Sequence, residues 1–245
     1  MSFRHFLPYA ALGQAELMVD AIQACIDDCR GTSSVVENKP FLSSVFPLDD
    51  FRLFNDKVLY MPKLEMHLDA TPMHTAAVRG KMDVIAHLLK LKSYDVNDDH
   101  QDAPALSLAL YSRNLDVAEL LLSGGAQPGC GLLFNALHAA ARCGVKNETE
   151  LFVKHYRVDV DVQDKDGATP VVHAPHLPED QARETIRLLF ELGAIPKREV
   201  GKYAWTYSAL AKAMGKRKLA VELANRTLQT AEEASDDGSS CTMAL

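Results

Sequence analysis

The segment DATPMHTAAVRGKMDVIAHLLK, Asp69–Lys90, carries the signals of two short helices joined by a turn. Thr71 can cap a helix, and Pro72 is tolerated in the first helical turn because its missing N–H would have no partner there. Gly80 suits a turn that requires a positive φ. Beyond it, apolar residues recur at helical spacing and predict a second helix with one buried face: Val84, Ile85, Leu88 and Leu89. Neither helix can bury its apolar face alone, so the segment needs neighbours on which to stack.

The same pattern returns along the chain. A fragment of it, DGATP, recurs at Asp166–Pro170. Thr71 and Thr169 are 98 residues apart (169 − 71 = 98), close to three periods of about 33 residues. A shift of 33 residues also superposes the apolar positions of 69–90 on those of 102–123. This interval indicates one structural unit that the chain uses several times.

Three stretches, TPMHTAA, NALHAAA and DGATPVVHA, occur in phase with downstream pairs of leucines and Gly-Ala pairs. In this arrangement the chain resembles ankyrin repeats, which combine a turn, a T-P-L-H-x-A motif and two helices in about 33 residues. The resemblance implies an all-α fold, an ankyrin-repeat solenoid of about six to seven helix-turn-helix units with degenerate terminal units. We expect divergent N-terminal ankyrin-like units and a capping region at 1–68, core repeats at 69–198, a C-terminal capping repeat at 199–230 and a disordered tail at 231–245.

The unit at 166–196 departs from this pattern. Pro175 and Pro178 stand where its first helix should end, and proline breaks the helical hydrogen-bond ladder. The segment PHLPEDQ, Pro175–Gln181, is therefore predicted to form a longer loop between two helices.

Composition sets limits on location and partners. The chain has 245 residues, 47% of them hydrophobic and 24% charged, and a formal net charge of −7, which argues against a strongly basic nucleic-acid-binding face. No stretch has the ~18 consecutive apolar residues of a membrane helix, and the N-terminus lacks a secretory signal. The five cysteines are odd in number and form no CxxC pair, which indicates reduced thiols. We expect a cytoplasmic or nuclear monomer with no nucleic-acid or membrane partner.

The resemblance also implies where a partner binds. Turn tips and first-helix faces would line the concave side of the stack, which usually contacts a protein. Carried over position by position, the predicted partner-binding residues are Val78, Arg79, Tyr111, Ser112, Arg142, Cys143, His173 and His176. Arg79, Tyr111 and Arg142 lead this set because Arg and Tyr are favoured interface anchors. The alternative that these are merely solvated surface residues stays open.

The histidines raise the question of a metal. His173 and His176, with Glu179 and Asp180 nearby, have residue types that bind zinc. The two prolines interrupt any regular helix there, and there is no cysteine cluster, so we expect no metal. His74 and His138 match the structural histidine of the family, whose usual role is hydrogen bonding across turns.

Motifs for catalysis are absent: the sequence has no GxSxG, GxxxxGK[ST] or HExxH. The Asp-rich turns at 95–102 and 159–166 do not meet the EF-hand spacing, and aspartate is common in such turns because it bonds its own backbone. We therefore expect no catalytic residues and no cofactor.

Two functional hypotheses follow. The favoured one is a non-enzymatic adaptor that binds an unidentified protein through the concave groove. The alternative is an enzyme or biosynthetic accessory protein in which degenerate segments, 29–68 and 175–181, frame a small-molecule pocket. Its candidate acid–base groups are His67, His173, His176, Glu179 and Asp180.

Overall fold

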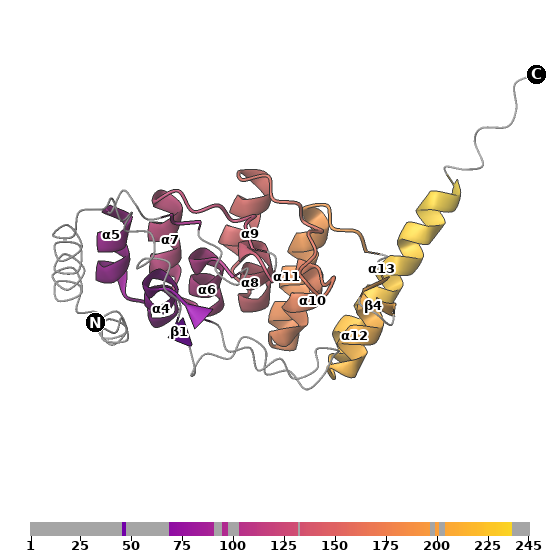
Figure 1. Ribbon diagram of the computed structural model, residues 1–245. Coiled ribbons are helices and arrows are strands. Elements are labelled where there is room, and N and C mark those ends of the chain that lie inside the picture. Colours follow the sequence, from indigo (N-terminus) through magenta and orange to yellow (C-terminus); the bar gives the residue numbers. More distant parts are fainter. Residues whose placement is uncertain are drawn as a thin grey trace, which may run out of the picture. The chain divides into compact units, whose positions relative to one another are not determined.

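The computed structural model describes residues 46–47, 69–90, 95–97, 103–131, 133–196, 199–200 and 204–236. The chain divides into two compact units, which we treat separately. Unit 1 comprises Met1–Asn55 with Leu64–Ala140, and unit 2 comprises Asp56–Lys63 with Ala141–Leu245. The described residues are mostly helical, with ten α-helices and little strand, as expected for an all-α fold (Figure 1). None of these helices is both long enough and apolar enough to span a membrane.

Unit 1 begins, among the described residues, with a short antiparallel strand pair. Strand β1 (Phe46–Pro47) pairs with β2 (Asp69–Ala70), and Phe46 lies opposite Ala70. Two helix pairs follow, and a further helix starts at the end of the unit: α4 (Pro72–Arg79), α5 (Met82–Lys90), α6 (Ala105–Tyr111), α7 (Leu115–Ser123) and α8 (Ala136–Cys143). Helix α4 packs against α6, and α5 packs against α7. First helix thus contacts first helix, and second contacts second, as stacked repeats require.

The predicted shift of 33 residues is visible in the core of unit 1. Ala76 and Ala109 are both fully buried, and the second helices bury the corresponding residues Val84 and Val117. Small residues at the first pair of positions let α4 and α6 approach closely, while the larger ones fill the space between α5 and α7. The repeated sequence therefore corresponds to a repeated packing.

Unit 2 contains the remaining described elements: α9 (Lys146–Lys154), α10 (Pro170–His173), the 3₁₀ turn η3 (Ala174–His176), α11 (Glu179–Glu191), β3 (Glu199–Val200), β4 (Trp205–Thr206), α12 (Tyr207–Ala213) and α13 (Arg217–Asp236). Strands β3 and β4 form an antiparallel hairpin. Helix α11 packs against both α9 and α13, and α10 packs against α12. One apolar cluster joins these helices, with Leu189 of α11 and Ala211 of α12 fully buried.

Two predictions about unit 2 need correction. The segment 175–181 does not form a long loop: Pro175 lies within η3, and Pro178 is the residue before α11, where it needs no N–H. The predicted tail also starts too early, because α13 continues to Asp236. Alanine and glutamate in AEEAS are good helix formers, which explains the extension. The expected N-terminal units of 1–68, apart from Phe46–Pro47, lie outside the described residues, as does 237–245.

Candidate functional site

The predicted contact residues of unit 1 lie at the C-terminal ends of two neighbouring helices, α4 and α6. Arg79 is exposed, whereas Val78, Tyr111 and Ser112 are half-buried. Helix α4 ends there because Gly80 adopts the left-handed conformation, with φ 69°. The structure therefore brings these four side chains to equivalent ends of two packed helices.

Asn114, in the turn between α6 and α7, joins these two helix ends. Its side-chain Nδ2 donates hydrogen bonds to the backbone oxygens of Ala77 and Val78, both at 2.8 Å. These carbonyls lie in the last turn of α4, where oxygens lack intrahelical partners. The bonds fix the end of α4 against the turn after α6, so the surface that carries Val78 and Ser112 is formed before any partner arrives.

Tyr111 is held by an aromatic neighbour. Its ring centroid lies 5.8 Å from that of Phe134, with an angle of 58° between the ring planes. Phe134 is only 1% exposed and cannot move without opening the core. A tyrosine restrained in this way loses little rotamer freedom when it binds a partner, which favours a role as an anchor.

The turns between repeats are also linked to one another. In unit 1, the backbone N–H of Gln127 donates to Asn97 Oδ1 at 2.7 Å, and Asn97 Nδ2 donates to the Gly125 oxygen at 3.3 Å. In unit 2, the N–H of Ile195 donates to Asp161 Oδ2 at 3.0 Å. Asn97 and Asp161 occupy the same repeat position. Each unit therefore uses one Asx side chain to fix the turn of the following repeat.

The predicted contact residues of unit 2 are less accessible. Arg142 and His176 are half-buried, but Cys143 is 8% exposed and His173 is 5% exposed. The expectation that the latter two face an open groove is therefore corrected. For His173 the reason is the register: Val172 takes the place of the capping histidine, and His173 points inward.

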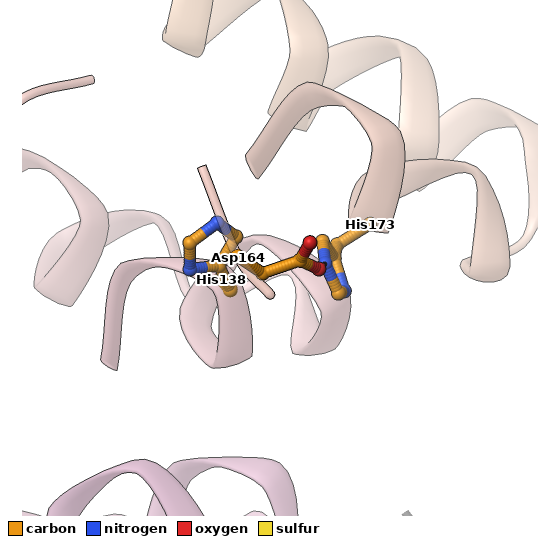
Figure 2. Close-up of side chains that lie close together, drawn as sticks. All are labelled: His138, Asp164 and His173. Carbon is orange, nitrogen blue, oxygen red and sulfur yellow. Dashed lines mark hydrogen bonds and ion pairs between the residues drawn. The ribbon is translucent and has the colours of Figure 1, made fainter. Parts of the chain in front are cut away.

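His173 forms a buried pair with Asp164 (Figure 2). Its Nε2 lies 2.8 Å from Asp164 Oδ2, and the two side chains are 6% and 1% exposed. The other carboxylate oxygen of Asp164 accepts from the backbone N–H of Asp166 at 2.9 Å and of Ala168 at 2.8 Å. Asp164 thus closes its own turn and ties that turn to α10. Such burial leaves the pair little access to a substrate.

The other proposed acid–base groups are committed to different contacts. Glu179 Oε1 accepts from the backbone N–H of Lys218 at 2.8 Å and of Leu219 at 3.2 Å, in the first turn of α13. Asp180 is exposed and lies 3.7 Å from an Arg183 nitrogen. His67 lies outside the described residues. These groups do not gather around one reaction centre in the described part of unit 2, and nothing in their arrangement supports an enzyme.

Sequence reasoning missed the residues that organise these surfaces. Asn114 is a polar residue in a turn before a helix, and that position is the only signal that could have singled it out. The backbone bonds of Asp164 were expected for an Asp-rich turn, but its contact with His173 was not. A pair of arginines on α11, Arg183 and Arg187, was missed as well. Both bond Glu222 of α13, 39 and 35 residues away, and sequence spacing within one helix says nothing about such a contact.

Comparison with known families agrees with this geometry. Residues 54–131 match the family model for ankyrin repeats (3 copies). Within the described part of that span lie the α4–α5 and α6–α7 pairs with their shared register. His74 takes part in the cap of its own helix, since the N–H of Thr71 donates to His74 Nδ1 at 3.3 Å. Residues 54–131 therefore belong to the ankyrin-repeat family, and such repeats are generally modules for protein–protein interaction.

Proposed function

We propose that the chain is a non-enzymatic adaptor that binds a partner protein through the first-helix ends of unit 1. The contact residues are Val78, Arg79, Tyr111 and Ser112. The reduced state expected for its cysteines favours a cytoplasmic or nuclear setting for this interaction. The proposal rests on one observation, the link that Asn114 makes between the ends of α4 and α6.

Preorganisation of this surface favours binding. Binding costs free energy whenever flexible side chains and loops must become ordered at the interface. In unit 1, Asn114 and the Asn97 turn already hold the backbone, and Phe134 already restrains Tyr111. The free energy of contacts with a partner is therefore not offset by a large ordering cost, and it contributes to affinity. Arg79 supplies an exposed guanidinium beside this rigid surface, which suits a partner with an acidic or aromatic side chain.

Affinity purification with mass spectrometry from the native organism tests this proposal. The baits are the wild-type chain, an Arg79→Glu, Tyr111→Ala double variant, and a Lys90→Glu control. Lys90 is an exposed basic residue at the end of α5, so the control makes the same charge change on a second helix of the same unit. We expect at least one protein to be recovered roughly tenfold less with the double variant, as for the loss of two interface anchors.

The interaction must then be reproduced with purified proteins by isothermal titration calorimetry. Equal recovery of every protein with the double variant and with wild type would contradict the proposal, provided that circular dichroism shows the same helicity for all three baits. If only the Lys90→Glu bait loses a protein, the interface lies on the second helices instead of the first.

A further inference from the structure

A basic hollow runs between α11 and α13 of unit 2, on the second helices rather than the first. It has a volume of about 660 Å³ and is open to solvent. Four of its lining residues are basic: Arg183, Arg187, Lys218 and Arg226. Since the chain as a whole carries a net charge of −7, this concentration of positive charge is a local feature and not a reflection of composition.

Three of the four basic side chains are held in place by contacts with neighbouring residues. Glu222 accepts from Arg183 Nε at 2.7 Å and from Arg187 Nε at 2.6 Å, so a single carboxylate positions both guanidinium groups. Partial burial of Glu222 opposes its ionisation, but the hydrogen bonds from the two arginines outweigh this and lower the pKa of the carboxyl. The Arg226 guanidinium lies 4.7 Å from the centre of the Phe190 ring, over its face. The entropic cost of ordering these arginine side chains when a ligand binds is therefore small.

Among the side chains that line the hollow, the positive charges outnumber the negative ones. Besides Glu222, Asp180 lies at ion-pair distance from Arg183. Four basic side chains in the lining thus face one lining carboxylate, Glu222, which two arginines share. Outside the lining, Glu179 also acts on Arg183, and Glu184, which is paired with Lys146, acts on Arg187. Arginine can bind a further carboxylate through its remaining N–H donors.

Exposed apolar side chains flank the hollow. Val221 lines it and is 61% exposed, and Leu228, seven residues later on α13, is 63% exposed. A spacing of seven residues places both on one side of the helix. A binding surface that combines arginines with exposed aliphatic groups suits a peptide with carboxylates and apolar side chains. A polyphosphate would use only the basic side chains and would leave Val221 and Leu228 without an apolar partner.

We propose that the hollow between α11 and α13 binds an acidic peptide segment of a partner protein, with carboxylates on Arg187 and Lys218 and an apolar side chain against Val221. This site is separate from the first-helix surface of unit 1 and does not depend on it. The chain would then contact proteins through two faces.

Fluorescence anisotropy with a defined probe tests the site. The probe is a fluorescein-labelled peptide of sequence Glu-Glu-Leu-Glu-Glu-Leu-Glu-Glu, and the matched peptide has glutamine in place of each glutamate. We expect the full-length chain to bind only the acidic peptide, and the affinity to fall as salt rises. An Arg187→Glu, Lys218→Glu variant should bind at least about tenfold more weakly, which corresponds to about 1.4 kcal/mol.

A gain of affinity gives a second test that a structural role would not produce. Glu222→Gln removes the internal carboxylate that competes for the arginines, so the acidic peptide should bind roughly threefold more tightly at low salt. Lys212→Glu on α12 is a single charge-reversal control outside the hollow and should bind as wild type does. The Arg79→Glu, Tyr111→Ala variant should also bind the acidic peptide normally, which separates this site from the one in unit 1.

Several results would overturn the proposal. These are a failure of the acidic peptide to bind, equal affinity for the acidic and glutamine peptides, or an unchanged affinity for the acidic peptide in the Arg187→Glu, Lys218→Glu variant. Binding of inositol hexakisphosphate that the acidic peptide cannot displace would assign the site to phosphates. A dimer in light scattering that the same double variant dissociates, without peptide binding, would assign it to a second copy of the chain.

Discussion

Equivalent helix starts in the two units satisfy their polar groups in different ways. In unit 1, α4 begins with a capping box, in which His74 Nδ1 lies 2.7 Å from Thr71 Oγ1 and the backbone groups of both residues take part. In unit 2, α10 begins at the equivalent Thr169, but Val172 stands where His74 would be. Thr169 makes no side-chain cap and instead bonds Tyr207, with 2.9 Å between the two oxygens.

The difference shows that a repeat keeps the requirement for hydrogen bonds but not the residue that meets it. Unit 1 meets the requirement within one helix turn, through residues three apart. Unit 2 meets it through Asp164, which bonds its own turn and His173, and through a contact with a later helix. Local caps should therefore matter most in unit 1, and longer-range pairs in unit 2.

Removal of the buried carboxylate in unit 2 should have the largest effect. Asp164→Ala leaves His173 and the Ala168 N–H buried without this partner, which should lower the free energy of unfolding by about 3 kcal/mol. Trp205 is the single tryptophan and belongs to unit 2, so its fluorescence in a urea titration reports this change directly. Asp164→Asn, which keeps one acceptor oxygen, should cost less. Equal unfolding of Asp164→Ala and wild type would show that the pair is not structural.

Loss of the local cap in unit 1 comes next. His74 is 1% exposed, so His74→Ala removes a capping partner and also leaves a cavity, for an expected cost of about 2.5 kcal/mol. Val172→Ala, the same repeat position in unit 2, is the matched comparison and should cost under about 1 kcal/mol because Val172 caps nothing. Urea unfolding followed by circular dichroism measures both. Similar costs at the two positions would remove the distinction between the units.

The left-handed glycines allow one substitution to be compared in both units. Gly80 and Gly144 both have φ 69°, and an added Cβ would lie 3.0 Å from Asn114 in unit 1 and from Leu177 in unit 2. Alanine at either position should lower the free energy of unfolding by about 2 kcal/mol, of which about 1 kcal/mol is due to backbone strain. Gly215, at φ 76° with no atom within 4 Å of such a Cβ, isolates the backbone part and should cost about 1 kcal/mol. Thermal unfolding ranks the three, and a Gly215→Ala cost as large as the others would exclude a role for the contacts.

The residue after the left-handed position sharpens the comparison further: Asn114 follows Arg113, at φ 60°, and Lys216 follows Gly215. Asn114 donates to two carbonyls in unit 1, whereas Lys216 in unit 2 donates to one, the Leu177 oxygen at 2.7 Å. Asn114→Ala should therefore destabilise by about 1.5 kcal/mol, and Lys216→Ala by less than about 1 kcal/mol. Chemical unfolding of each variant gives these values. The reverse order would mean that the number of hydrogen bonds does not set the cost.

The smallest effect is a pH dependence confined to unit 2. The pKa of Glu222 is lowered in the folded state, so its stabilising contribution is present above the unfolded pKa and is lost as pH falls through the folded pKa. Acidification below about pH 4 should therefore lower the urea midpoint of wild type slightly more than that of Glu222→Gln. The effect is small because the ion pairs are partly exposed and screened. Parallel pH profiles for the two proteins would contradict it.

The sequence alone determined the repeat. Apolar spacing in Val84 and Leu88, the Ala positions of the first helices and the helix-ending Gly80 are local signals, because each follows from the dihedral angles and burial of residues a few positions apart. They predicted the helix pairs and the cap at Thr71, both of which the structure shows.

The tertiary structure decided which polar groups meet. Asn114 bonds carbonyls 36 and 37 residues away, and Arg183 and Arg187 meet one glutamate on another helix. The burial of His173 likewise depends on Asp164, nine residues earlier. Helical periodicity predicts which face of a helix is apolar, but partners across a repeat interface are selected by packing distance and desolvation, and neither leaves a mark in local sequence.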